Sequence, residues 1–195
     1  MDQIIICIIP KEPVFSDIKK LMVDYSSKLG SKKALTFPPH LTLIGRFKTH
    51  KYDELKKELA VLFYDFKFFK IELKGLLNFD SPKILFLKPC DLTNLKLLHE
   101  ELLDLVSDFR EPWIRDTFKE AGFSEKQKEY VKLYGSPYVK EFYNPHLTLA
   151  GPDVDEKKFS EIIDSKFQHT YDLTIDTIKI LKRVGDNWVI EEINK

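Results

Sequence analysis

One pattern of histidine and threonine occurs twice in the sequence. Pro39-His40-Leu41-Thr42-Leu43-Ile44-Gly45 returns 106 residues later as Pro145-His146-Leu147-Thr148-Leu149-Ala150-Gly151, with six of the seven positions identical. Alternate residues of a strand face the same side, so each copy places its histidine and threonine on one face and its leucines on the other. If the two strands pair across a pseudo-two-fold axis, two imidazoles and two hydroxyls line one cleft.

Two imidazoles and two hydroxyls in one cleft suit the cleavage of a phosphodiester. An in-line displacement at phosphorus needs a proton taken up at one end and given at the other, and imidazole titrates near neutral pH. Threonine hydroxyls can donate hydrogen bonds to the non-bridging oxygens as negative charge develops there. Neither motif has the neighbouring carboxylates of a magnesium-dependent phosphoryl transferase. We therefore expect catalysis without a metal or cofactor by His40, Thr42, His146 and Thr148.

The residues that follow each motif predict the same elements in the same order. An apolar pattern at helical spacing comes first, and Asp153 or Asp155 is available as the N-cap of the second helix. A strand that alternates apolar and polar residues follows, and then another strand after a turn. In the two copies these elements are the helices 52–63 and 159–167, the strands 69–73 and 171–175, the turns 80–82 and 185–187, and the strands 84–87 and 188–190.

The repeat predicts a single α+β domain over residues 1–195. We expect a duplicated β-α-β-β fold with two lobes, whose repeat cores are residues 40–90 and 146–193, and antiparallel sheets around a central cleft with pseudo-two-fold symmetry. Three further elements precede the repeats. They are a strand over 4–9, a helix over 16–29 ended by Gly30, and a leucine-rich helix over 92–109.

The segment 110–143 has no counterpart in the repeat. Ser124 and Gln127 have the spacing of a capping box, which predicts a short helix inside this segment. Two interpretations remain open: a packed connector between the lobes, or a flap over a binding site.

Composition limits the partners and the compartment. The chain has 195 residues, and its 31 lysines and arginines balance 31 aspartates and glutamates, which argues against coating long nucleic acid. No apolar run approaches the ~20 residues that span a bilayer, so we expect no membrane association. Cys7 and Cys90 lie in hydrophobic runs and are expected to be buried and reduced, as in a cytoplasmic protein. A monomer is the expected state.

Three residues near the motifs are candidates for substrate binding. Arg46 could contact phosphate, although an exposed surface arginine is an equal alternative. Phe47 and Tyr143 could each stack on a base, and a core or rim position is the alternative for both. Three further histidines have no second copy: His50, His99 and His169. Capping or surface roles are expected for His50 and His99.

The paired motifs resemble the two H-x-[ST]-x motifs of the two-histidine (2H) phosphoesterases. This superfamily includes bacterial 2′-5′ RNA ligase-like proteins and cyclic phosphodiesterases, and the resemblance covers nearly the whole chain. It implies a bilobal fold and metal-independent action on 2′,3′-cyclic phosphates or 2′-5′ linkages, with a small nucleotide or RNA terminus as substrate. A 2′-phosphate product and a reverse reaction that ligates RNA ends through a 2′-5′ bond are also implied. By the same resemblance, His40, Thr42, His146 and Thr148 form the catalytic tetrad.

Two other classes of function remain alternatives to an enzyme. A binding module would hold a nucleotide or RNA end without converting it, and a structural protein would use the duplication only to fold. Intact motifs in both copies favour the enzyme, because a pure binder has less need for two titrating groups.

Overall fold

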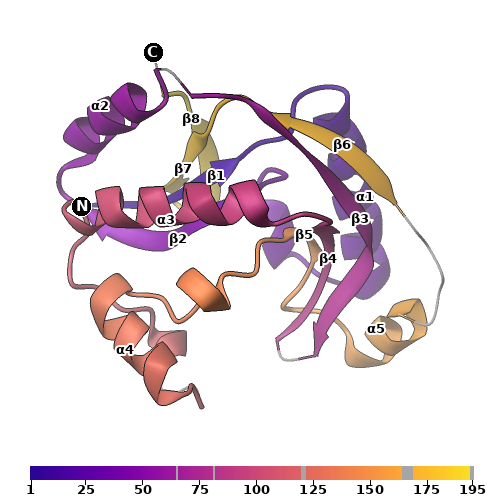
Figure 1. The fold of residues 1–195 in the computed structure, drawn as a ribbon. Coiled ribbons are helices and arrows are strands. Elements are labelled where there is room, and N and C mark those ends of the chain that lie inside the picture. Colours follow the sequence, from indigo (N-terminus) through magenta and orange to yellow (C-terminus); the bar gives the residue numbers. More distant parts are fainter. Residues whose placement is uncertain (65, 81, 120–121, 164–168, 194–195) are drawn as a thin grey trace.

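One antiparallel sheet forms the centre of the molecule in this computed structural model. The structure describes all residues except 65, 81, 120–121, 164–168 and 194–195. The sheet is curved, and its strands follow the order β6-β3-β4-β5-β2-β1-β7-β8 (Figure 1). The strand bounds are β1 (Asp2–Ile8), β2 (Leu41–Thr49), β3 (Phe69–Asp80), β4 (Lys83–Pro89), β5 (Leu147–Ala150), β6 (Thr170–Ile175), β7 (Lys179–Val184) and β8 (Asn187–Glu191). The predicted α+β class is confirmed.

Several helix ends coincide with signals in the sequence. Gly30 ends α1 with φ 68°, and Ser124 and Gln127 form the predicted capping box at the start of α4. Asp155, not Asp153, caps α5 by accepting a hydrogen bond from the backbone N–H of Lys158 at 3.0 Å. The α-helices are α1 (Val14–Leu29), α2 (Tyr52–Leu62), α3 (Thr93–Ser107), α4 (Glu125–Tyr134) and α5 (Glu156–Ile163). The 3-10 helices are η1 (Lys33–Thr36), η2 (Asp116–Phe118) and η3 (Lys140–Phe142).

The strands of each expected repeat are divided between the two halves of the sheet. β3 and β6, the equivalent strands of the two copies, pair with each other, for example at Ile71 and Leu173. The sheet order is symmetric about the junction of β5 with β2, where β4 mirrors β1. The units at equivalent positions are therefore β1-α1-β2 and β4-α3-β5, so the strand 84–87 opens the second unit and does not close the first.

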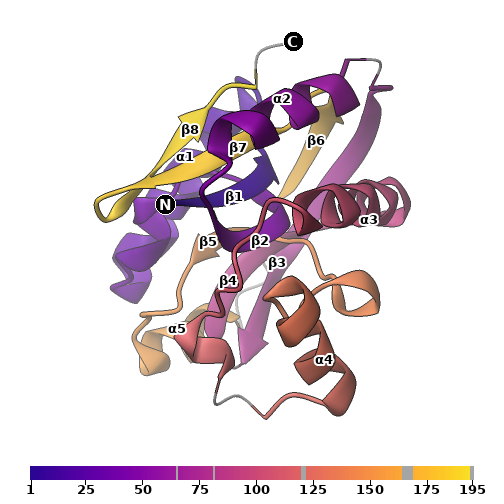
Figure 2. The ribbon, with the colours of Figure 1, turned by 90° about the vertical axis from the view of Figure 1, so that its left-hand side faces the viewer.

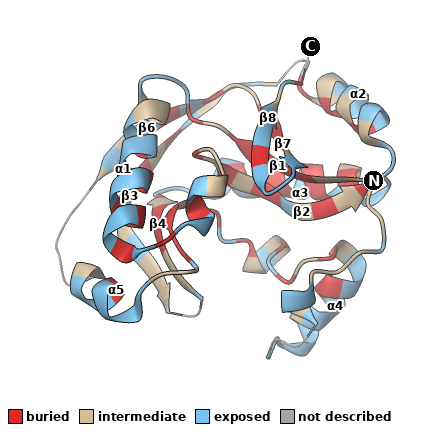
Figure 3. Ribbon diagram, turned by 180° about the vertical axis from the view of Figure 1, so that it is seen from behind, coloured by how far each residue is buried: buried red, intermediate tan, exposed pale blue. Residues whose placement is uncertain are grey.

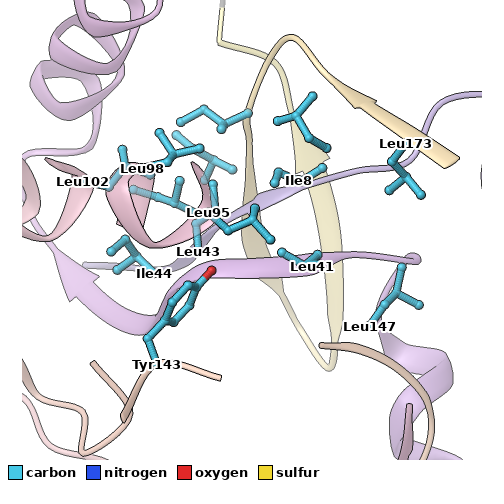
Figure 4. Close-up of a cluster of buried hydrophobic side chains, with 14 of the residues drawn as sticks. Ile8, Leu41, Leu43, Ile44, Leu95, Leu98, Leu102, Tyr143, Leu147 and Leu173 are labelled. Carbon is cyan, nitrogen blue, oxygen red and sulfur yellow. The ribbon is translucent and has the colours of Figure 1, made fainter. Parts of the chain in front are cut away.

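The core lies between the sheet and the helices α1 and α3. α1 packs against β5 and α3 against β2, so each helix covers the motif strand of the other unit. Figure 4 shows Leu95, Leu98 and Leu102 of α3 beside Leu43 and Ile44 of β2. Figure 3 shows the burial along the central strands and the exposed outer faces of α1 and α4.

The two cysteines differ in exposure. Cys7 is buried in β1, as expected, whereas Cys90 is exposed. Cys90 follows the end of β4, where the hydrophobic run leaves the core, so its predicted burial was wrong. Some sequence predictions, namely the turn residue Ser81 and the helix residue Phe167, lie outside the described residues.

The segment 110–143 is attached to β2 and α3, and its helix α4 lies beside α3 (Figure 2). The backbone N–H of Glu111 donates to the carbonyl of Lys48 at 2.8 Å. At the other end, the hydroxyl of Tyr143 donates to the carbonyl of Thr42 at 3.0 Å. In the middle, Gly135 has φ 69°, and an added Cβ would lie 2.3 Å from a guanidinium nitrogen of Arg110. These contacts hold the segment against the strand that carries the first motif.

Across the described ranges, no helix combines the length and the apolar character that a bilayer span requires.

Candidate active site

One residue pair brings the two motifs together. β2 and β5 are antiparallel and pair at Leu41 and Leu147, whose side chains are fully buried on the helix-covered face. The neighbours of these leucines point to the opposite face, and the antiparallel register sets His40 beside Thr148 and Thr42 beside His146. Directly opposite side chains in such a pair have Cβ atoms about 4.5–5.5 Å apart. We call this side the motif face, defined by its four partly buried residues His40, Thr42, His146 and Thr148.

Each motif histidine is held by the same backbone contact. The Nδ1 atom of His40 lies 2.9 Å from the carbonyl oxygen of Pro38, and that of His146 lies 2.9 Å from the carbonyl oxygen of Asn144. A carbonyl can only accept, so both Nδ1 atoms carry a proton and donate it. Nε2 is therefore a free base in the neutral ring and a proton donor in the imidazolium.

Burial keeps both imidazoles neutral in the free protein. Desolvation, with a smaller contribution from the charge of His146, lowers the pKa of His40 to about 4, against the opposing effect of the hydrogen bond to Pro38. Desolvation also lowers the pKa of His146. An anion bound between the rings would raise both pKa values, because it stabilises the imidazolium forms. The pair can thus take up one proton together with an anionic substrate.

The two histidines have different aromatic surroundings. Phe37 stacks on His40 with ring centroids 5.3 Å apart, and Trp188 stacks on Phe37 at 5.2 Å. His146 instead contacts Phe79 and Phe86, with centroids 5.0 Å and 5.1 Å from its own. These rings fix the orientation of each imidazole, so the two sides of the motif face are not interchangeable.

Comparison with known proteins shows the family of the chain. The family model described as "2'-5' RNA ligase superfamily" matches residues 10–187. The chain belongs to this superfamily. The resemblance to the 2H phosphoesterases drawn from the two motifs is thereby confirmed.

Several solved structures have a similar fold over nearly the whole length of this chain. E. coli LigT complexed with 3'-AMP matches with a TM-score of 0.53 and 12% identity, over 98% of this chain and 95% of that one. LigT complexed with NADP+ matches with a TM-score of 0.53 and 13% identity over the same shares. LigT complexed with ATP gives 0.51 and 11%, again over 98% and 95%. At these identities the likeness establishes the fold. A search of curated protein sequences returns no match.

In this superfamily member, the three predicted substrate-binding residues lie in different settings. Arg46 is partly buried, with its guanidinium carbon 4.7 Å from the ring centre of Trp188. Phe47 is only 4% exposed and belongs to the core, and Tyr143 is 7% exposed with its ring stacked on His99. The alternative of a core position therefore holds for Phe47 and Tyr143, because neither ring has a free face for a base.

Sequence reasoning missed the aromatic residues that surround the histidines. Phe37 precedes His40 by three residues, and Tyr143 precedes His146 by the same number. This equivalent position in the repeat is the sequence signal that could have identified Phe37. The contacts of Trp188, Phe79 and Phe86 follow from long-range pairing and have no local signal. Phe86 is the cross-strand neighbour of Thr148, as Cys7 is of Thr42.

The remaining titratable groups near the site have structural roles. Burial raises the pKa of the Cys7 thiol well above its ordinary value, which leaves it protonated and unreactive. His99 is 1% exposed and bonded on both sides, so its expected capping or surface role was wrong. Nowhere in the described residues do three or more His, Cys, Asp or Glu side chains gather as metal ligands.

Proposed function

We propose that the protein is a metal-independent phosphodiesterase that acts on 2′,3′-cyclic phosphates or 2′-5′ linkages of RNA ends or small nucleotides. The observation that carries this proposal is the matched pair of Nδ1–carbonyl bonds at His40 and His146. Each bond directs the reactive Nε2 atom of its ring away from the backbone, and the strand register places both rings on one face. Membership of the 2′-5′ RNA ligase superfamily supports the same reaction class.

Hydrolysis of a cyclic phosphate needs one neutral and one protonated histidine. Water gives a proton to Nε2 of the neutral imidazole, and its oxygen forms a bond to phosphorus. The bond from phosphorus to one ribose oxygen breaks, and that oxygen takes the proton from Nε2 of the other imidazolium. The hydroxyls of Thr42 and Thr148 donate to the non-bridging oxygens as their charge grows. The product is a phosphomonoester beside a free hydroxyl. If a nucleotide hydroxyl attacks in place of water, the same bond breaks and the product is a phosphodiester, and the reverse of that step cleaves the phosphodiester to a cyclic phosphate.

The nucleotide class of substrate is supported by the structures of similar fold. E. coli LigT has been crystallised with 3'-AMP, with NADP+ and with ATP. All three ligands are adenine nucleotides with at least one phosphate. A small nucleotide or an RNA terminus is therefore the substrate we propose here, without membrane or long RNA partners.

The test is hydrolysis of adenosine 2′,3′-cyclic phosphate in excess EDTA. The parent is compared with His40→Ala, with His146→Ala and with a matched control, His50→Ala, which removes an exposed imidazole. We expect turnover by the parent and by the control, and a loss of at least a hundredfold in kcat for each motif variant. A binding module would show no turnover and only a weaker Kd in the motif variants. No turnover of either this substrate or a 2′-5′ linkage would overturn the proposal.

A further inference from the structure

Three arginines from separate parts of the chain meet beyond the aromatic stack of His40. Arg46 lies in β2, Arg183 in β7 and Arg115 in the segment 110–143. Arg183 is the cross-strand partner of Trp188, whose ring is also the one that Arg46 covers at 4.7 Å. Burial and the charges of Arg115 and Arg183 together lower the pKa of Arg46 to about 10. Arg115 and Arg183 thus lie close enough to Arg46 for their charges to act on it.

The position of Arg115 follows from the attachment of its segment to β2. The backbone of Glu111 bonds to Lys48, and the Lys48 ammonium lies 4.9 Å from the ring centre of Trp113. Arg115 comes two residues later, partly buried, with its guanidinium carbon 4.8 Å from the ring of Phe118. The segment therefore brings a third positive charge to the end of β2 where Arg46 lies.

Two members of this arginine cluster, Arg46 and Arg115, are in no ion pair within the described residues. Arg183 is exposed, pairs with Asp186 at 3.6 Å, and donates to the carbonyl of Gly185 at 2.9 Å and to Oε1 of Gln3 at 3.2 Å. The Nε atom of Arg46 is buried and has no hydrogen-bond partner in the described part of the chain. A buried donor without a partner is unfavourable, and the neighbouring positive charges add to that cost at Arg46. An anion held by the cluster would remove both penalties.

Two aromatic rings separate the arginine cluster from His40. The guanidinium carbon of Arg46 lies 4.7 Å from the ring centre of Trp188, which lies 5.2 Å from that of Phe37, and Phe37 lies 5.3 Å from His40. Phe37 and Trp188 lie between Arg46 and His40 as two stacked rings. A phosphate between the imidazoles would therefore leave the cluster free for another anionic group.

We propose that Arg46, Arg115 and Arg183 form a second phosphate subsite, so that the preferred substrates are nucleotides or short oligonucleotides with a further phosphate beyond the reacting one. This inference rests on the proposed function for its reacting phosphate. Guanidinium forks match phosphate oxygens and stay charged at all ordinary pH values. Zero net charge over the chain is compatible with such a site, because the positive charge is local.

Equilibrium binding tests the subsite without requiring turnover. Kd values are measured in EDTA by calorimetry for adenosine 2′-phosphate and for its 5′-phosphorylated and 5′-diphosphorylated forms. For the parent, we expect the Kd of at least one longer ligand to be lower than that of the monophosphate by about tenfold or more. A charge-assisted hydrogen bond has an effect of this size. Arg115→Gln and Arg183→Gln should each reduce this advantage. The matched control Lys119→Gln removes an exposed charge from the same segment and should keep it.

The outcomes separate the subsite from the reaction. Arg115→Lys keeps the charge but loses the planar fork, so it should retain part of the advantage even if Arg115→Gln folds poorly. Equal affinity of the parent for all three ligands, or an advantage that survives in both arginine variants, would overturn the subsite. A protein that shows the advantage but hydrolyses no phosphodiester would retain the subsite and lose the proposed function.

Discussion

The rings of His99 and Tyr143 lie parallel behind the first motif, with centroids 3.9 Å apart and an interplanar angle of 3°. Tyr143 donates its hydroxyl proton to the carbonyl of Thr42, and Nδ1 of His99 lies 2.7 Å from the carbonyl of Leu43. Nε2 of His99 accepts from the backbone N–H of Lys140 at 3.2 Å, so the ring is neutral. Figure 4 shows the Tyr143 oxygen directed at β2. The two rings thus fasten the segment 110–143 to the strand of the first motif.

Removing the Tyr143 hydroxyl should destabilise the protein modestly. Tyr143→Phe keeps the stack on His99 and loses one hydrogen bond, so the free energy of unfolding should fall by about 0.5–1.5 kcal/mol. Urea denaturation measures this change. The control Tyr64→Phe alters a side chain that is 72% exposed and should leave the midpoint unchanged. Equal midpoints for Tyr143→Phe and the parent would show that the bond to Thr42 contributes nothing.

Acidification should weaken the fold well above the range where carboxylates titrate. Burial lowers the pKa of His40 to about 4 and lowers the pKa values of His99 and His146, whereas unfolded histidine has a pKa near 6.5. Below about pH 6.5 the unfolded chain therefore binds more protons than the folded one, so the free energy of unfolding decreases as the pH is lowered. The urea midpoint should decline between pH 7 and 5, and less steeply in His40→Asn. A flat profile in the parent would contradict the burial of these rings.

The pH dependence of the reaction should differ between free and substrate-bound protein. Because the free imidazoles have lowered pKa values, the protonated form needed as the acid becomes rare as pH rises, and kcat/KM should fall from pH 6 to 8. Bound phosphate raises these pKa values, so the decline in kcat should occur at higher pH. Steady-state rates on a cyclic nucleotide in matched buffers measure both profiles. Superimposed profiles would show that substrate does not charge the histidines.

The two threonines should contribute to turnover more than to binding. Thr42→Val and Thr148→Val remove a hydroxyl with little change in shape, and each should reduce kcat by about a hundredfold, as for other transition-state donors. KM should change much less, because the hydrogen bonds strengthen as charge develops. Thr42→Ser and Thr148→Ser keep the hydroxyl and should recover most of the rate. A valine variant with parental kcat would exclude that threonine from the reaction.

Local patterns predicted the motif strands and several boundaries correctly. The alternation in His40-Leu41-Thr42 set the buried and the motif faces, and Gly30 and Ser124 mark helix ends through their own backbone or side-chain bonds. These features depend on residues close in sequence. The same reasoning could not tell that β3 pairs with β6, because alternation defines the faces of a strand and not its neighbour.

The contacts around the site depend on residues far apart in the chain. Phe37 and Trp188 stack although about 150 residues separate them, and no local pattern links the two. His99 sits in a leucine-rich helix where a surface position was expected, yet it is buried because its two ring nitrogens find backbone partners. The charged neighbours of Arg46 come from β7 and the segment 110–143, which lie near it only in the folded chain.

The most direct test asks whether the two histidines act on one phosphate. We would measure kcat for adenosine 2′,3′-cyclic phosphate in EDTA with the parent, His40→Ala, His146→Ala and the double variant. Groups that act as a unit are strongly non-additive. We predict that kcat falls at least a hundredfold in each single variant. The fold loss in the double variant should be well below the product of the two single-variant losses. A single variant with the parental kcat, or losses that multiply fully, would contradict a shared two-histidine site.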